Sequence, residues 1–143
     1  MPIDPWNVFT LDFGHFPKPY TAFVTLLDIA IYLALSMKVG RARVKYKVEA
    51  PATDGPDAFL RIMRVQANTV EQMVQHLPLL WIAAFAMDDM FAASFGAVWA
   101  LSRILYARGY YQKAKRRHKG FLIGSVVDAI LFAGAMAGVI ASF

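Results

Sequence analysis

A run of charged and polar side chains recurs at helical spacing inside a mostly apolar stretch of the chain. Arg61, Arg64, Asn68, Glu71 and Gln75 follow one another at intervals of three or four residues. Because a helix advances about 100° per residue, these side chains share roughly a third of its circumference. An arginine fork pairs with carboxylates, a glutamate with an ammonium group and an asparagine with an amide. The spacing therefore predicts a site for a zwitterionic, peptide-like ligand.

A second polar face follows on the next apolar segment. Tyr106, Tyr110 and Arg117 lie three, seven and fourteen residues after Arg103, which again places them on one side of a helix. Both polar faces begin near the same end of their helices. Packed together, they would form a pocket that opens at that end.

The polar faces could instead be clasps between helices, since ionisable residues inside a membrane do pair with one another. A charge near the bilayer centre costs about 2.5–3.5 kcal/mol, and small residues pack helices together at a lower cost. Two full polar faces therefore favour a binding pocket. The opposite face of the first segment, which includes Leu60 and Met63, suits lipid or partner helices.

Several other kinds of chemistry lack the residues they need. The chain has no cysteine, so it has no thiolate of its own. No cluster of histidine and carboxylate stands at metal-ligand spacing, and no glycine-rich phosphate loop indicates a nucleotide; no nucleic acid partner is expected. We expect His76 to be a hydrogen-bonded packing residue. Asp28 and Asp128 should each pair with a buried arginine such as Arg103 or face a polar seam, with a proton relay as the less favoured alternative.

The elements that must position these residues are membrane helices. Hydrophobic residues make up 58% of the 143 residues and charged residues 17%, whereas soluble domains carry about 45–50% and about 25%. The apolar segments are near or above the roughly 20 residues that a helix needs to cross a bilayer, and they lack the two-residue alternation of a barrel. We therefore expect one domain, residues 1–143, forming an all-α integral membrane four-helix bundle. The expected helices are residues 20–37, 57–87, 90–111 and 120–143.

Charge alternates between the loops of this arrangement. The first loop, KVGRARVKYKVEAP, and the third, QKAKRRHKG, are basic, whereas the second contains Asp88 and Asp89. The positive-inside rule places both basic loops in the cytoplasm and hence both termini outside. The N-terminal stretch MPIDPWNVFTLDFGHFPKPY lacks the basic and apolar regions of a cleavable signal peptide.

The segment RIMRVQANTVE resembles the hallmark of the membrane-associated proteins in eicosanoid and glutathione metabolism, the MAPEG family. ARVKYKVEAP and SRILYARGYYQKAKRRHKG resemble its microsomal glutathione transferase branch, nearest to type 3 and to leukotriene C4 synthase. The similarity runs from about residue 40 to residue 120. It implies a homotrimer of four-helix subunits that binds glutathione between neighbouring subunits near the cytoplasmic face, without a metal.

The resemblance also implies roles for individual residues. Arg117 falls on the thiol-activating arginine, with Arg116 as a competitor because loop length varies at this point. Gln72 departs from the family pattern, in which a tyrosine is found in the leukotriene synthase branch. By motif position, the glutathione ligands would be Arg43, Arg64, Gln66, Asn68, Glu71, Tyr106 and Tyr110.

The leading hypothesis is a membrane-bound glutathione transferase that activates the glutathione thiolate for attack on a lipophilic electrophile, with glutathione-dependent reduction of lipid hydroperoxides as a further activity. Two alternatives stay open. One is a non-catalytic lipid-binding or scaffold protein of the same fold, and the other is a small proton-coupled transporter in which Asp28 is the coupling carboxylate. The compact loops favour a bacterial inner membrane, with the endoplasmic reticulum membrane as the alternative.

Overall fold

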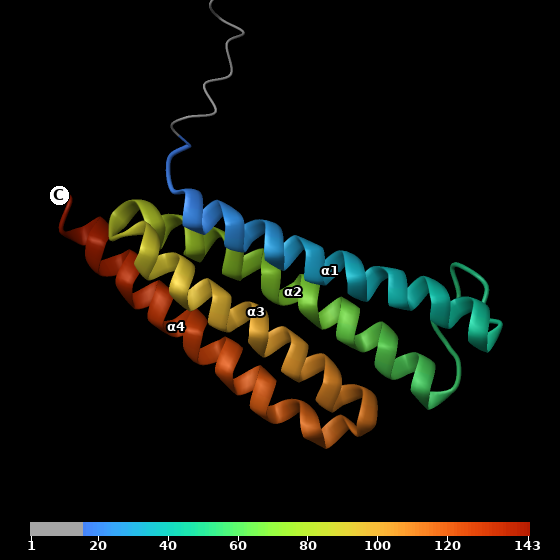
Figure 1. Cartoon of the computed structure of the whole chain (residues 1–143). Helices are drawn as coiled ribbons and strands as arrows, with labels where there is room; N and C mark the ends of the chain where they lie inside the picture. Colours follow the sequence, from blue (N-terminus) through green and yellow to red (C-terminus); the bar gives the residue numbers. More distant parts are fainter. Residues whose placement is uncertain (1–15) are drawn as a thin grey trace, which may run out of the picture.

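A computed structural model describes residues 16–143, which form four long helices joined by short connections (Figure 1). Most of the N-terminal stretch assessed for a signal peptide lies outside the described residues. Consecutive helices run in opposite directions, so the α1–α2 and α3–α4 connections lie at one end and the C-terminus at the other (Figure 1). The described residues contain no strand, which confirms the expected all-α bundle. The helices are α1 (Pro19–Tyr46), α2 (Asp57–Ala86), α3 (Asp89–Gln112) and α4 (His118–Ile140), with a short 3-10 helix, η2 (Ala114–Arg117), before α4.

Three stretches of the bundle are long and apolar enough to cross a membrane: α1, α3, and η2 together with α4. The helix α2 has 30 residues but is more polar, because it carries the charged face described above. The helix α1 continues past the expected end at residue 37, so most of the first basic segment is helical rather than a loop. Lysine, arginine and alanine are good helix formers, and α1 ends only where Lys47 adopts a left-handed conformation with φ 54°.

The acidic turn between α2 and α3 ties helix ends together. Asp88 caps α3 by accepting a hydrogen bond from the Phe91 N–H at 2.9 Å, as N-terminal caps commonly do. The Asp89 carboxylate accepts hydrogen bonds from the backbone N–H groups of Tyr20 at 3.1 Å and Thr21 at 3.0 Å. Asp89 therefore fixes the start of α1 against the start of α3.

The helix α4 packs closely on α3 through glycines. A Cβ atom on Gly120 would collide with the backbone of Tyr106 and come within 2.7 Å of the Ser102 carbonyl oxygen. One turn further on, a Cβ atom on Gly124 would lie 2.9 Å from the Ser102 hydroxyl. Small residues let membrane helices approach in this way. The contact holds Arg103 and Tyr106 in register with the start of α4.

We expect the Gly120→Ala variant to unfold at a lower temperature than the parent protein in detergent, because the added methyl group must push α3 and α4 apart. Overpacking of this kind costs about 1–3 kcal/mol. Gly40→Ala is the matched control, since a Cβ atom there meets nothing within 4 Å and alanine favours helix. Equal midpoints for the two variants would show that the α3–α4 contact is not tight.

Candidate functional site

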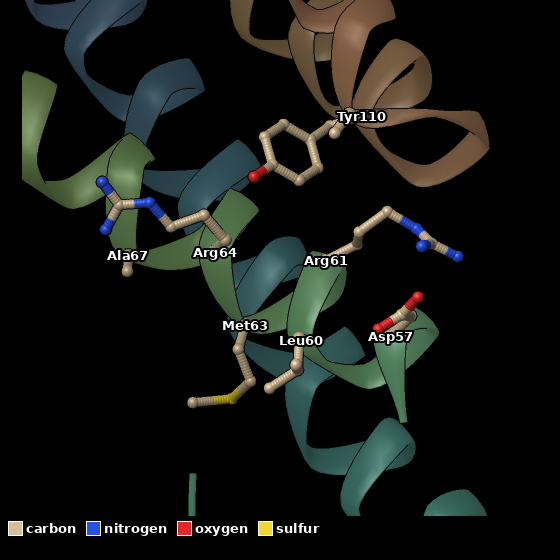
Figure 2. Close-up of a pocket in the computed structure, with 8 residues that line it drawn as sticks. Asp57, Leu60, Arg61, Met63, Arg64, Ala67 and Tyr110 are labelled. Carbon is tan, nitrogen blue, oxygen red and sulfur yellow. The ribbon is translucent and has the colours of Figure 1, made fainter. Parts of the chain in front are cut away.

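An open hollow of about 570 Å³ lies where α2 faces the end of α3, at the end of the bundle that carries the two basic segments. Figure 2 shows the Tyr110 ring reaching from α3 toward α2, with its hydroxyl group on the side of Arg64. The hollow thus combines side chains from both polar faces, as the spacing predicts. Its lining residues are Asp57, Leu60, Arg61, Met63, Arg64, Ala67, Tyr110 and Ala114.

The polar face of α2 forms a connected set of side chains. Arg64 and Glu71 make an ion pair at 3.3 Å, with their side chains 55% and 49% exposed. The Asn68 amide donates to the other Glu71 oxygen at 3.5 Å. Arg103, buried on α3, donates to the Asn68 oxygen at 3.4 Å and to the Gly120 carbonyl at 3.4 Å. Arg103 therefore orients Asn68, while Arg64 and Glu71 stay accessible to a ligand.

Arg117 was expected to continue the helix face of Tyr106 and Tyr110, but α3 ends at Gln112 and Arg117 lies in η2, from which it still reaches Tyr110. Arg117 donates a hydrogen bond to the Tyr110 hydroxyl at 3.2 Å, and its guanidinium group lies 5.3 Å from the centre of that ring. Tyr106 lies beside Tyr110, with ring centres 5.6 Å apart. Arg116 instead donates to the Gln112 side chain. Of the two competing arginines, Arg117 is the one hydrogen-bonded to a residue that lines the hollow, Tyr110.

Of the predicted glutathione ligands, Arg64 and Tyr110 line the hollow, whereas Asn68, Glu71 and Tyr106 do not, and two others point to different parts of the subunit. Gln66 donates to the Tyr32 hydroxyl at 2.7 Å and so faces α1. Arg43 donates to the Ala52 carbonyl at 2.8 Å and holds the α1–α2 connection together. Neither residue lines the hollow within a single subunit.

The sequence pattern predicted other places for some of the residues that line the hollow. Leu60 and Met63 were expected on the face toward lipid or partner helices, yet both line the hollow. The hollow spans a wider arc of α2 than the polar stripe, so it includes apolar side chains on one flank of Arg64. Arg61 of the polar face also lines the hollow, and its buried Nε has no hydrogen-bond partner among the described residues. The helical period identifies a polar face but does not give the width of a cavity.

A second polar cluster lies buried among all four helices. His76, fully buried on α2, has Nδ1 2.7 Å from an Asp128 oxygen on α4 and Nε2 3.6 Å from an Asp28 oxygen on α1. Its ring stacks on Trp99 of α3, with centres 4.0 Å apart. The expected partner Arg103 is therefore not the partner of either aspartate among the described contacts. Instead, both aspartates face a polar seam centred on His76, because α2 lies between α1 and α4 at this level.

These features define an integral membrane four-helix bundle with a polar site at one end of α2 and α3. The chain belongs to the MAPEG family, whose sequence model matches residues 21–137. This membership confirms the resemblance carried by RIMRVQANTVE and the two flanking segments.

Several relatives align with this chain over most of its length and most of their own. An uncharacterized protein of Synechocystis sp. is 49% identical over 121 residues, 85% of this chain and 88% of its own. Microsomal glutathione S-transferase 2 of Homo sapiens is 35% identical over 122 residues, 85% of this chain and 83% of its own. Leukotriene C4 synthase of Bos taurus is 34% identical over 122 residues, 85% of this chain and 81% of its own.

Replacing His76 by phenylalanine should strongly destabilise the bundle. The ring would still stack on Trp99, but Asp28 and Asp128 would lose their shared partner, and breaking a buried ion pair costs about 3–5 kcal/mol. Thermal unfolding in detergent measures the loss. His118→Phe, at an exposed position, is the control.

The same experiment separates charge from packing. Adding Asp28→Asn and Asp128→Asn to the His76→Phe variant should recover part of the lost stability, because the amides leave no unpaired charge buried in the bundle. If the triple variant is no more stable than His76→Phe alone, the cluster does not act through its charges.

Proposed function

We propose that this protein is a membrane-bound glutathione transferase, in which α2 holds glutathione and Arg117 stabilises its thiolate. The observation that carries the proposal is the hollow lined by Arg64, which pairs with Glu71, and by Tyr110, which accepts a hydrogen bond from Arg117. Microsomal glutathione S-transferase 2, by its name, acts on glutathione, and its similarity over 85% of this chain supports the same co-substrate here.

The side chains of α2 match the chemistry of glutathione. The tripeptide carries two carboxylates, one ammonium group and two amide bonds. Arg64 suits a carboxylate, because the guanidinium fork can donate two parallel hydrogen bonds. Glu71 suits the ammonium group, and Asn68 suits an amide. Binding would break the Arg64–Glu71 ion pair. Arg64 would then pair with a carboxylate of glutathione, and Glu71 would pair with its ammonium group.

Arg117 would supply the electrostatic part of the reaction. A free thiol is mostly protonated at neutral pH, and a nearby fixed cation favours the thiolate. The thiolate attacks an electrophilic carbon, a carbon–sulfur bond forms and the leaving group departs with its electron pair. With a lipid hydroperoxide, two glutathione molecules would give the disulfide, an alcohol and water. The lipophilic partner would reach the thiolate from the bilayer.

The exposure of the site supports an assembly of several copies, which we take to be a homotrimer. Arg64 and Glu71 lie about half exposed on α2, and charges facing hydrocarbon cost about 2.5–3.5 kcal/mol each on insertion scales. A neighbouring copy that covers this face would remove the cost and could add residues to the site. Arg43 and Gln66 would then contact glutathione only if the ligand extends across α1.

The charge distribution supports a cytoplasmic site. The basic end of α1 and the basic segment around η2 lie at the same end of the bundle, opposite the turn with Asp88 and Asp89 (Figure 1). The positive-inside rule places that end, and therefore the hollow, in the cytoplasm. We expect a bacterial inner membrane, with the endoplasmic reticulum membrane as the alternative.

Arg117→Ala should lower the rate of glutathione conjugation to an aryl halide by at least about tenfold, the factor that corresponds to one unit of thiol pKa. Losing the cation raises the pKa of the bound thiol, so less thiolate forms at neutral pH. The thiolate absorbance of the bound complex, titrated with base, should shift to higher pH. Arg116→Ala is the control and should change little. The reverse result would transfer the role to Arg116.

Glu71→Gln should weaken glutathione binding by about 10–100-fold, since a hydrogen bond to a charged group contributes about 1.5–3 kcal/mol. Isothermal titration calorimetry on the detergent-solubilised protein measures it. Asp54→Asn, an exposed change in the α1–α2 connection, is the control. If the parent protein itself shows no glutathione binding, the transferase proposal fails and the scaffold alternative gains support.

A further inference from the structure

A second hollow, of about 380 Å³, lies on the α1–α2 side of the bundle near its basic end. It contains three cationic side chains, and none of its lining residues is acidic in the described part of the chain. The transferase mechanism proposed above uses none of these residues. The lining residues are Ala34, Lys38, Arg41, Ala42, Lys45, Tyr46 and Ile62.

The three cations share one narrow face of α1. Lys38, Arg41 and Lys45 are three and four residues apart, which places them within about 60° of one another around the helix. Ala34 lies within the same sector, one turn before Lys38, whereas Ala42 lies about 40° outside it, one turn after Lys38. Their small side chains leave the space between the longer cationic ones, and Ile62 of α2 forms the opposite wall. The short side chain of Ala34 therefore leaves space beside the cations, within the hollow that they line.

Aromatic rings hold two of the cations in position. The Lys38 ammonium group lies 3.6 Å from the centre of the Tyr111 ring of α3, and the Lys45 ammonium group lies 5.2 Å from the centre of the Tyr46 ring. Such contacts attract a cation to the face of the ring while leaving its N–H groups free to donate. Lys38 and Lys45 are thus partly ordered before any anion arrives.

The same face of α1 becomes apolar as it enters the membrane. Leu27, Ala30 and Ala34 precede Lys38 at helical spacing, and all three are exposed. The apolar run of α1 ends at Met37, so the cations begin at the level where hydrocarbon gives way to headgroups. A cationic hollow continued by an exposed apolar track has the two-part chemistry of a phospholipid.

We propose that this hollow binds the headgroup of an anionic phospholipid, whose acyl chain lies along Leu27, Ala30 and Ala34. A phosphodiester would accept hydrogen bonds from the cations, each of which contributes about 1 kcal/mol near an anionic surface. A second copy of the chain fits less well, because in a parallel assembly it brings its own basic end to this level, where cations outnumber acidic groups such as Glu49 and Asp54. The acidic turn of this chain lies at the other end of the bundle.

The test uses the full chain reconstituted in vesicles of equal parts phosphatidylglycerol and phosphatidylcholine. After extraction, native mass spectrometry measures how much of each lipid stays bound. We expect phosphatidylglycerol to be retained in excess. The triple variant Lys38→Gln, Arg41→Gln, Lys45→Gln should bind phosphatidylglycerol at least about tenfold more weakly, because the loss of three such contacts is worth more than a tenfold change in affinity.

The control variant is Lys113→Gln, Lys115→Gln, Lys119→Gln, which removes the same charge at the same end of the bundle but outside the hollow. It should retain phosphatidylglycerol as the parent does. Ala34→Phe keeps every charge and fills the hollow, so it should also weaken retention, and it serves if the triple variant does not fold. Equal losses in both triple variants, or no loss in the first triple variant and in Ala34→Phe, would overturn the proposal.

Two competitors distinguish the source of the anion. Glycerol phosphate carries a phosphate group without acyl chains, and glutathione carries carboxylates. Neither should displace the bound phosphatidylglycerol. Displacement by glycerol phosphate at matched concentration would show a soluble-anion site, and displacement by glutathione would show that the hollow belongs to the co-substrate; either result contradicts the lipid assignment.

Discussion

The cost of placing a charge in hydrocarbon governs how this bundle is built. Each ionisable group within a membrane span must find a partner, lie at the end of a helix, or be covered by something other than lipid. His76 meets the first condition for Asp28 and Asp128, since it lies between them. Arg117 meets the second condition, since it is the last residue of η2. Arg64 and Glu71 pair with each other yet remain half exposed, and this is the surface that the proposed ligand or a neighbouring copy would cover.

The two ends of the bundle therefore have different roles. At one end, aspartates cap and tie helices, with Asp89 joining α1 to α3. At the other end, helix ends carry cations, and the helices separate enough to leave open hollows. The close glycine contact between α4 and α3 lies beside these hollows. It fixes the position of Arg103, which in turn orients Asn68. A rigid contact thus supports an accessible site.

The two hollows differ in the charges that line them. The hollow beside Tyr110 contains Asp57 as well as Arg61 and Arg64, and Glu71 is paired with Arg64, so it offers groups of both signs. The hollow on the α1–α2 side contains cations only. A zwitterionic tripeptide complements the first arrangement, and a phosphodiester complements the second. If both proposals hold, one end of the protein binds a soluble co-substrate and a lipid at separate places.

The sequence alone determined the four helices, the polar face of α2 and the family, because segment length, helical period and motif spacing are properties of neighbouring residues. It also placed Tyr106 and Tyr110 on one face of a helix, although Arg117, expected to continue that face, lies beyond the end of α3 in η2. Only the tertiary structure decided which polar groups meet. Asp128 lies 52 residues from His76 along the chain, and Gln66 turns toward Tyr32 rather than toward Arg64. Such pairings depend on how each helix is rotated and shifted against its neighbours, and that is set by packing contacts such as Gly120 against Tyr106, which no local pattern specifies.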